Sequence, residues 1–191
     1  MYIKFTYVNG NHMPDFDGLV FDFALTSQYP TDRPVFYGTC NSASGAGLLE
    51  VISKETYDAD KAAELIARAE KQKAQTASAI AERRWRNEVA GTTLGGMRIE
   101  TDRTAVAMAT SAALAASLDP DYSVRWKSAD GFVTLDANQV LGLAQIIRAH
   151  VQACFDREAD LLDALDAGTY DTEMLDTGWP NSEELDDAGK L

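Results

Sequence analysis

Few residues of this chain have the types and spacing that catalysis or metal binding requires. The two histidines, His12 and His150, are far apart, and neither belongs to an HExxH or CxxC pattern of the kind that binds zinc. We expect His150 to be a packed or half-exposed helix residue. Asp15, Asp17 and Asp22 lie close together beside a glycine, but their spacing is not that of an EF-hand loop. This cluster is therefore predicted to be a turn with exposed acids.

Motifs for nucleophilic chemistry and for phosphate binding are also missing from the sequence. The glycines at 45–47 lack the lysine and the serine or threonine of a phosphate loop, and no Gly-x-Ser-x-Gly elbow occurs. Cys40 and Cys154 form no CxxC pair, so we expect two reduced core residues. The sequence predicts no catalytic, cofactor-binding or metal-binding residue, and hence a protein that is not an enzyme. A glycan hydrolase with paired acids is the weaker alternative, because no pair can be assigned a geometry.

Composition and charge limit the classes of partner. The chain has 191 residues, of which 46% are hydrophobic, so it can form a core. Residues 156–191 contain twelve acids and two bases, and so carry −10 of the net −13. Such a charge repels phosphate backbones and anionic lipids, which argues against nucleic-acid and membrane partners. No apolar run is long enough for a bilayer, and the N-terminus lacks signal-peptide features, so a cytoplasmic or particle-bound protein is expected.

The patterning predicts an α+β fold with four parts. These are a small β-rich module (1–52), a helical connector (53–90), an α+β domain (91–167) and an acidic tail (168–191). In the first part, the alternation of Ile3, Phe5 and Tyr7 predicts a strand, followed by an Asn-Gly turn. Further strands are predicted at 16–25, 35–39 and 48–52, with a loop at 41–47.

The connector is predicted to be a helix from about 58 to 89. Its apolar stripe fades across 71–78, so that stretch is expected to be exposed or broken. Arg83, Arg84 and Arg86 surround Trp85 near its end. We favour ion pairs with Glu82, Glu88 or the acidic tail over nucleic-acid binding for these arginines.

The third part shows the clearest local signals. A strand at 97–100 is followed by Thr101 or Asp102 as the cap of a helix to Leu118, whose seven alanines permit close packing against a sheet. An Asp-Gly turn then joins hairpin strands at 124–127 and 132–135. Asp136 and Gln139 form a capping-box pattern for a last helix that ends near Gly168. This helix is too long for so small a domain, so part of it should contact the connector or another subunit.

In the tail, apolar residues are sparse among acids. A flexible, solubilising tail is one interpretation, and a segment that docks on a partner is the other. Aromatic and arginine residues are typical interface anchors, so five residues are predicted to contact partners. They are Arg84, Trp85, Tyr170, Leu175 and Trp179. Removing residues 169–191 should then weaken partner binding and leave the fold intact.

Four motifs follow one another within residues 81–165. They are RWRNE (84–88), GMRIETDR (96–103), VRWKSADG (124–131) and HVQACFDRE (150–158). With these motifs the stretch resembles an uncharacterised domain that recurs in tailed-bacteriophage proteins, typically at the C-terminal end of proteins from the tail-fibre and tail-assembly region. Residues 1–50 and the acidic tail lie outside the resemblance.

The resemblance implies a setting and no enzymatic activity. It leads us to expect a structural protein of the virion at the tail fibre or baseplate, whose partners are fibre or baseplate proteins or a second copy of the chain. The alternative is an assembly chaperone that binds the fibre transiently in the host cytoplasm.

Overall fold

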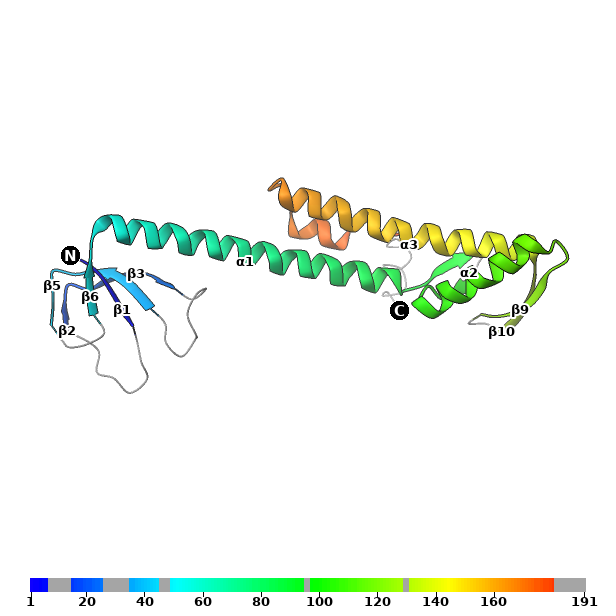
Figure 1. Cartoon of the computed structure of the whole chain (residues 1–191), viewed down its shortest axis with the longest axis horizontal. Helices are drawn as coiled ribbons and strands as arrows, with labels where there is room; N and C mark the ends of the chain where they lie inside the picture. The colour runs from blue at the N-terminus through cyan, green and yellow to red at the C-terminus, as the bar shows by residue number, and fades with distance from the viewer. Residues whose placement is uncertain (7–14, 26–34, 45–48, 95–96, 129–130, 181–191) are drawn as a thin grey trace. The chain divides into compact units, whose positions relative to one another are not determined.

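The computed structural model describes residues 1–6, 15–25, 35–44, 49–94, 97–128 and 131–180 (Figure 1). The chain forms two compact units, Met1–Ala74 and Gln75–Leu191. The boundary falls inside the helix that was predicted as a separate connector. The mixed α+β class is as predicted, with a β-rich first unit and helices and hairpins in the second.

A four-stranded antiparallel sheet forms the body of the first unit. Its strand order is β3 (Val20–Leu25), β4 (Val35–Thr39), β1 (Tyr2–Thr6) and β6 (Leu49–Ile52). A second pair joins β2 (Asp15–Asp17) to β5 (Ser42–Ser44). The predicted strand at 16–25 is thus divided at Gly18, whose φ is +66°. The predicted loop at 41–47 is wrong over its first residues, because β5 pairs there with β2.

Alternation of side chains gives this sheet an apolar cluster on each face. Ile3 and Phe5 of β1 pack on one face with Cys40, against residues from the β2–β5 pair. Val35 and Tyr37 of β4 pack on the other face. Cys40 and Cys154 are both free and buried, as predicted. The Asn-Gly turn, His12, Leu48 and the glycines at 45–47 lie outside the described residues.

The helix α1 (Lys54–Glu88) begins against this sheet. Tyr57 is buried with Val35 and Tyr37, and its hydroxyl donates to Asp22 Oδ2 at 2.7 Å. Lys61 also donates to Asp22, at 2.5 Å. The hydrogen bond from Lys61, followed by the one from Tyr57, holds the pKa of the Asp22 carboxyl below its usual range. Burial, followed by the hydrogen bond to Asp22, raises the pKa of Tyr57. Asp22 is therefore an ion-paired strand residue and not part of an exposed turn.

The middle of α1 is exposed and unbroken. Residues 71–75 are all exposed, and the helix continues through them without interruption. Leu65 and Ile66, two large apolar residues of the same helix, are exposed as well. The structure thus decides between the two predicted alternatives for this stretch.

In the second unit, a small hairpin follows α1. It joins β7 (Thr92–Leu94) to β8 (Met97–Ile99), and β7 was not predicted. Thr101 connects this hairpin to the helix end: its hydroxyl donates to Glu88 O at 2.5 Å and accepts from Gly91 N at 3.0 Å. Asp102 caps the next helix, so the predicted choice between Thr101 and Asp102 is settled.

The helix α2 (Arg103–Leu118) packs against α3 (Ala137–Asp166), with the hairpin of β9 (Ser123–Ser128) and β10 (Gly131–Asp136) joining them (Figure 1). Ala109, Ala112 and Ala116 are buried with Leu143 and Ile147 of α3. The alanines thus serve helix–helix packing as well as contact with the hairpin, whereas only sheet contact was predicted. The capping box at the start of α3 is confirmed, and so is Gly168 after its end, with φ of +72°.

Candidate protein-binding groove

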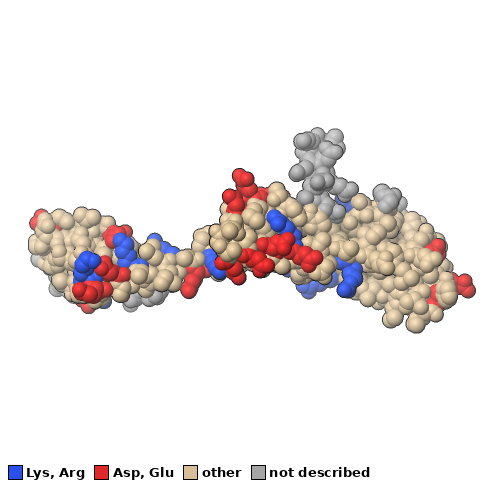
Figure 2. All heavy atoms as spheres, turned by 90° about the horizontal axis from the view of Figure 1, so that it is seen from above, with Lys and Arg blue, Asp and Glu red and all other residues tan. Residues whose placement is uncertain are grey.

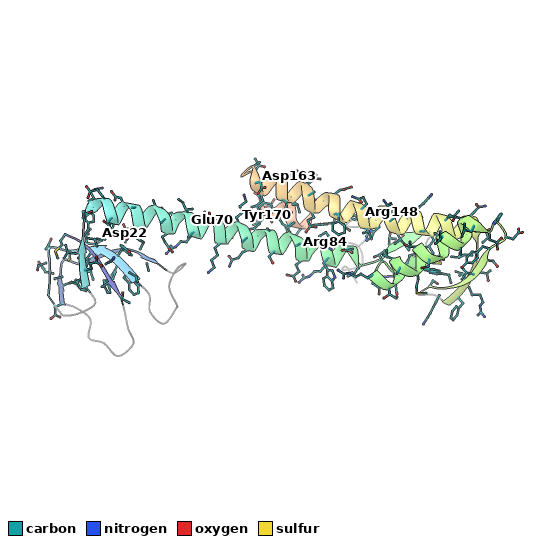
Figure 3. All side chains as sticks on the ribbon, viewed as in Figure 1. Asp22, Glu70, Arg84, Arg148, Asp163 and Tyr170 are labelled. Carbon is teal, nitrogen blue, oxygen red and sulfur yellow. The ribbon has the colours of Figure 1, made fainter. Side chains whose placement is uncertain are left out.

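Arg84 joins α1 to α3 within the second unit. Its Nε lies 3.1 Å from Glu158 Oε2 on α3, and its Nη1 pairs with Glu88 on α1. The guanidinium also lies 4.5 Å from the ring centre of Phe155 (Figure 3 labels Arg84). All of these partners belong to the same chain, so Arg84 makes internal contacts, and its predicted contact with a partner protein stays a prediction.

The neighbouring arginines behave as the charge pattern predicted. Arg86 pairs with Glu82 at 2.5 Å, one turn away on the exposed side of α1. Arg83 lies 3.4 Å from Asp176, in the predicted tail. The basic cluster is thus paired by acids of its own chain, as expected from the sequence.

The segment after α3 turns back and lies between α3 and α1 (Figure 1). Trp179 is only 3% exposed and packs with Ile80 of α1 and Leu161 of α3, while its Nε1 donates to Leu175 O at 2.7 Å. Tyr170, labelled in Figure 3, packs against the same cluster. Trp179 is therefore a core residue of its own chain, whereas Tyr170 and Leu175 are only partly buried, and their predicted contact with a partner stays a prediction.

Two consequences follow for the tail and for α3. Residues 169–180 of the predicted tail contain a short 3-10 helix, η1 (Thr172–Asp176). Removing residues 169–191 would expose Ile80 and Leu161, so the expectation of an intact fold is withdrawn. The predicted contact of the last helix with the connector is confirmed by the same cluster.

Of the five predicted contact residues, Trp85 is the most exposed. It lies on α1 and is 52% exposed. A single exposed aromatic residue is common on protein surfaces and defines no site by itself.

A groove of about 710 Å³ opens between α2 and β9. Met108, on the helix wall, is 57% exposed, and Trp126 of β9 is half-buried beneath the groove. The volume lies within the range of binding pockets, and most of the lining is apolar. The remaining lining residues come chiefly from β8, the first half of α2 and β9, namely Arg98, Ile99, Glu100, Asp102, Thr104, Ala105, Ala107, Ser111, Ala112, Tyr122, Val124, Arg125, Lys127, Ser128 and Phe132.

Basic side chains lie along the strand side of this groove. In the β9–β10 register, Arg125 is opposite Thr134 and Lys127 is opposite Phe132, so Arg125, Lys127 and Phe132 share one face of the hairpin. The Arg125 guanidinium lies 5.1 Å from the ring centre of Phe132. Acidic side chains instead gather over the C-terminal half of α3, where Asp156, Asp160, Asp163 and Asp166 are exposed (Figure 2).

The sequence carried a signal for this groove that the prediction did not use. Val124 and Trp126 pair with Leu135 and Val133 on the core face of the hairpin, which leaves Phe132 out of phase with the apolar alternation. A large apolar residue on the polar face of a strand is a candidate for binding. On α2, Met108 likewise stands outside the stripe of buried alanines.

Cys154 and His150 are close together but are not arranged as a nucleophile and its base. Cys154 Sγ lies 3.9 Å from His150 Nε2, and both side chains are buried. His150 Nε2 lies 3.0 Å from Asn87 O, a carbonyl, so this nitrogen must donate and cannot accept the thiol proton. Burial, followed by the charge of Glu88, raises the pKa of Cys154 to about 11. The pair is a core contact, which is the packed alternative predicted for His150.

Within the described ranges, no group of three or more histidine, cysteine or acidic residues is placed to hold a metal ion. None of the helices described is both long enough and apolar enough to cross a membrane.

Comparison with known proteins identifies one family. Residues 71–177 match the model of a domain of unknown function, DUF4376. No curated protein and no solved structure matches the chain. The matched range includes the C-terminal part of α1, both hairpins, α2, α3 and η1, and so all the elements that form the groove. Since the match spans more than half of the 191 residues, the chain belongs to the DUF4376 family.

Proposed function

We propose that the protein is a non-enzymatic structural component of a bacteriophage tail, in the tail-fibre or baseplate region, and acts through protein–protein contacts. The observation that supports protein–protein contact is the groove between α2 and β9. There Met108 and Phe132 are exposed next to a half-buried tryptophan, at a site without a histidine or cysteine. The setting in a phage tail rests on the resemblance of the four motifs within residues 81–165.

A structural component needs surfaces that are available after its own core is complete. In the second unit, the core residues of α2, β10 and α3 form one cluster and Trp179 closes another. The exposed apolar side chains of the groove take no part in this packing. Exposed apolar patches on a protein surface are typical of interaction sites. The partners proposed are fibre or baseplate proteins of the same virion.

Mass spectrometry of gradient-banded virions tests this proposal. In a phage that encodes this chain, we expect a constant molar ratio to the major tail and fibre proteins, unchanged after a high-salt wash. Absence from virions together with abundance in the infected cell would overturn the structural role and favour the assembly chaperone. A ratio that falls with each wash would likewise contradict a permanent component.

A further inference from the structure

The strand β9 has one edge without a strand partner. Among the described residues, β9 pairs only with β10, in a two-stranded sheet. Every second residue along such an edge directs its backbone N–H and C=O groups away from the sheet. These groups can pair with another extended chain.

The groove runs along this free edge. Residues from both faces of β9 line it, with Trp126 from the core face and Arg125 and Lys127 from the outer face, whereas β10 contributes Phe132 alone. A pocket over one face of a strand would collect alternate residues only. On the opposite wall, Ala105 and Met108 of α2 offer a small and a flexible side chain, which leaves room for side chains of different shapes.

We propose that this groove binds an extended segment of a partner protein as an added strand on β9. The segment would carry acidic residues at alternate positions, facing Arg125 and Lys127, and apolar residues between them, facing Met108 and Trp126. Strand addition obtains affinity from backbone hydrogen bonds and specificity from pockets for alternate side chains. This inference rests on the proposed function, because it specifies the partner of the same contact surface.

Charge complementarity selects an acidic segment. Arg125 and Lys127 lie two residues apart on one face of β9, whereas the acidic residues that line the groove, Glu100 and Asp102, lie in the segment between β8 and α2. Opposite charges in cross-strand pairs stabilise a sheet and like charges destabilise it. A second copy of the chain is disfavoured for this reason. Antiparallel pairing of two β9 strands about Trp126 would place Arg125 opposite Lys127 of the copy.

Selection from a peptide-display library on the purified full chain tests the proposal. The library presents peptides of about eight residues, with acidic, basic or neutral polar residues at alternate positions and apolar residues between them. We expect enrichment of peptides with Asp or Glu at the alternate positions. An enriched peptide should bind the Met108→Asp variant, and the Arg125→Glu/Lys127→Glu variant, at least about tenfold more weakly than the unchanged protein.

Matched controls distinguish strand addition from nonspecific hydrophobic binding. Leu114→Asp changes a residue of α2 that is 62% exposed and does not line the groove, so peptide affinity should stay unchanged. Methylating the backbone nitrogens of the peptide removes its hydrogen-bond donors and should abolish binding. Circular dichroism and thermal unfolding verify that each variant is folded.

Several results would overturn the inference. They are no enrichment, enrichment of basic or neutral peptides, equal binding by Met108→Asp, and equal binding of the methylated peptide. These outcomes are distinguishable from failure of the proposed function. Peptide selection can succeed on a protein that is absent from virions, and a virion component can fail to enrich any peptide.

Discussion

Trp85 is 52% exposed and Trp179 only 3%. The difference arises from their partners. Trp179 packs against Ile80 and Leu161, which are 99 and 18 residues earlier in the chain. Trp85 lies on an exposed face of α1. At the residue scale, a tryptophan in an acidic segment therefore predicts a packing contact, but it does not tell whether the contact is with the same chain or with a partner.

Trp179→Ala should destabilise the second unit by about 3 kcal/mol or more, because it removes a buried ring and leaves a cavity between α1 and α3. Denaturant unfolding followed by circular dichroism measures this loss. Trp85→Ala is the matched control and should change the free energy of unfolding by less than about 0.5 kcal/mol. Equal effects of the two substitutions would contradict the assignment of Trp179 to the core.

The turn from α1 into the β7–β8 hairpin shows how elements are joined in the second unit. Gly91 has φ of +90°, and a Cβ atom there would lie 2.8 Å from Ile99 O. Thr101, buried beside it, satisfies both the last helical carbonyl and the amide of Gly91. The end of α1 is thus fixed by a residue thirteen positions further on.

Gly91→Ala should lower the free energy of unfolding by about 1–3 kcal/mol, since alanine disfavours this φ and its methyl group meets a carbonyl oxygen. Gly142→Ala provides the opposite case. Gly142 lies inside α3 with open space around its Cα, so alanine should stabilise by up to about 1 kcal/mol through helix propensity. Denaturant midpoints of both variants measure the two signs, and a stabilising Gly91→Ala would refute the strained turn.

At the scale of the whole molecule, each unit contains its own apolar clusters. The two faces of the β-sheet and Tyr57 account for the clusters of Met1–Ala74. The contacts of α2 with α3, and of η1 and Trp179 with the two long helices, account for those of Gln75–Leu191. A unit with a complete core is expected to fold by itself.

Residues 75–191 expressed alone should therefore give one cooperative unfolding transition. Residues 75–168 are the matched comparison, because they lack Tyr170, Leu175 and Trp179. This shorter fragment should be less stable by about 3 kcal/mol or more, the loss expected for a buried tryptophan. Thermal unfolding of the two fragments measures the difference, and equal stability would show that the segment after α3 contributes nothing to the fold.

Sequence alone determined the features that depend on neighbours along the chain. The caps at Asp102 and Asp136, the glycine after α3, the pairing of β9 with β10 and that of Arg86 with Glu82 all involve residues close together in the chain. Backbone geometry and helix spacing fix such contacts. The α+β class followed from the same local periods.

Only the tertiary structure decided which residues are buried and which strand edges are paired. The short strands β5 and β7 pair with β2 and β8, and each has only three residues, which is too short to show an alternation of its own. Trp179 is buried because α1 and α3 meet, and the groove exists because α2 lies along a strand edge left unpaired. Burial and edge pairing depend on residues far apart in the chain, so a local pattern can mark a residue such as Phe132 as exposed and apolar but cannot specify the groove around it.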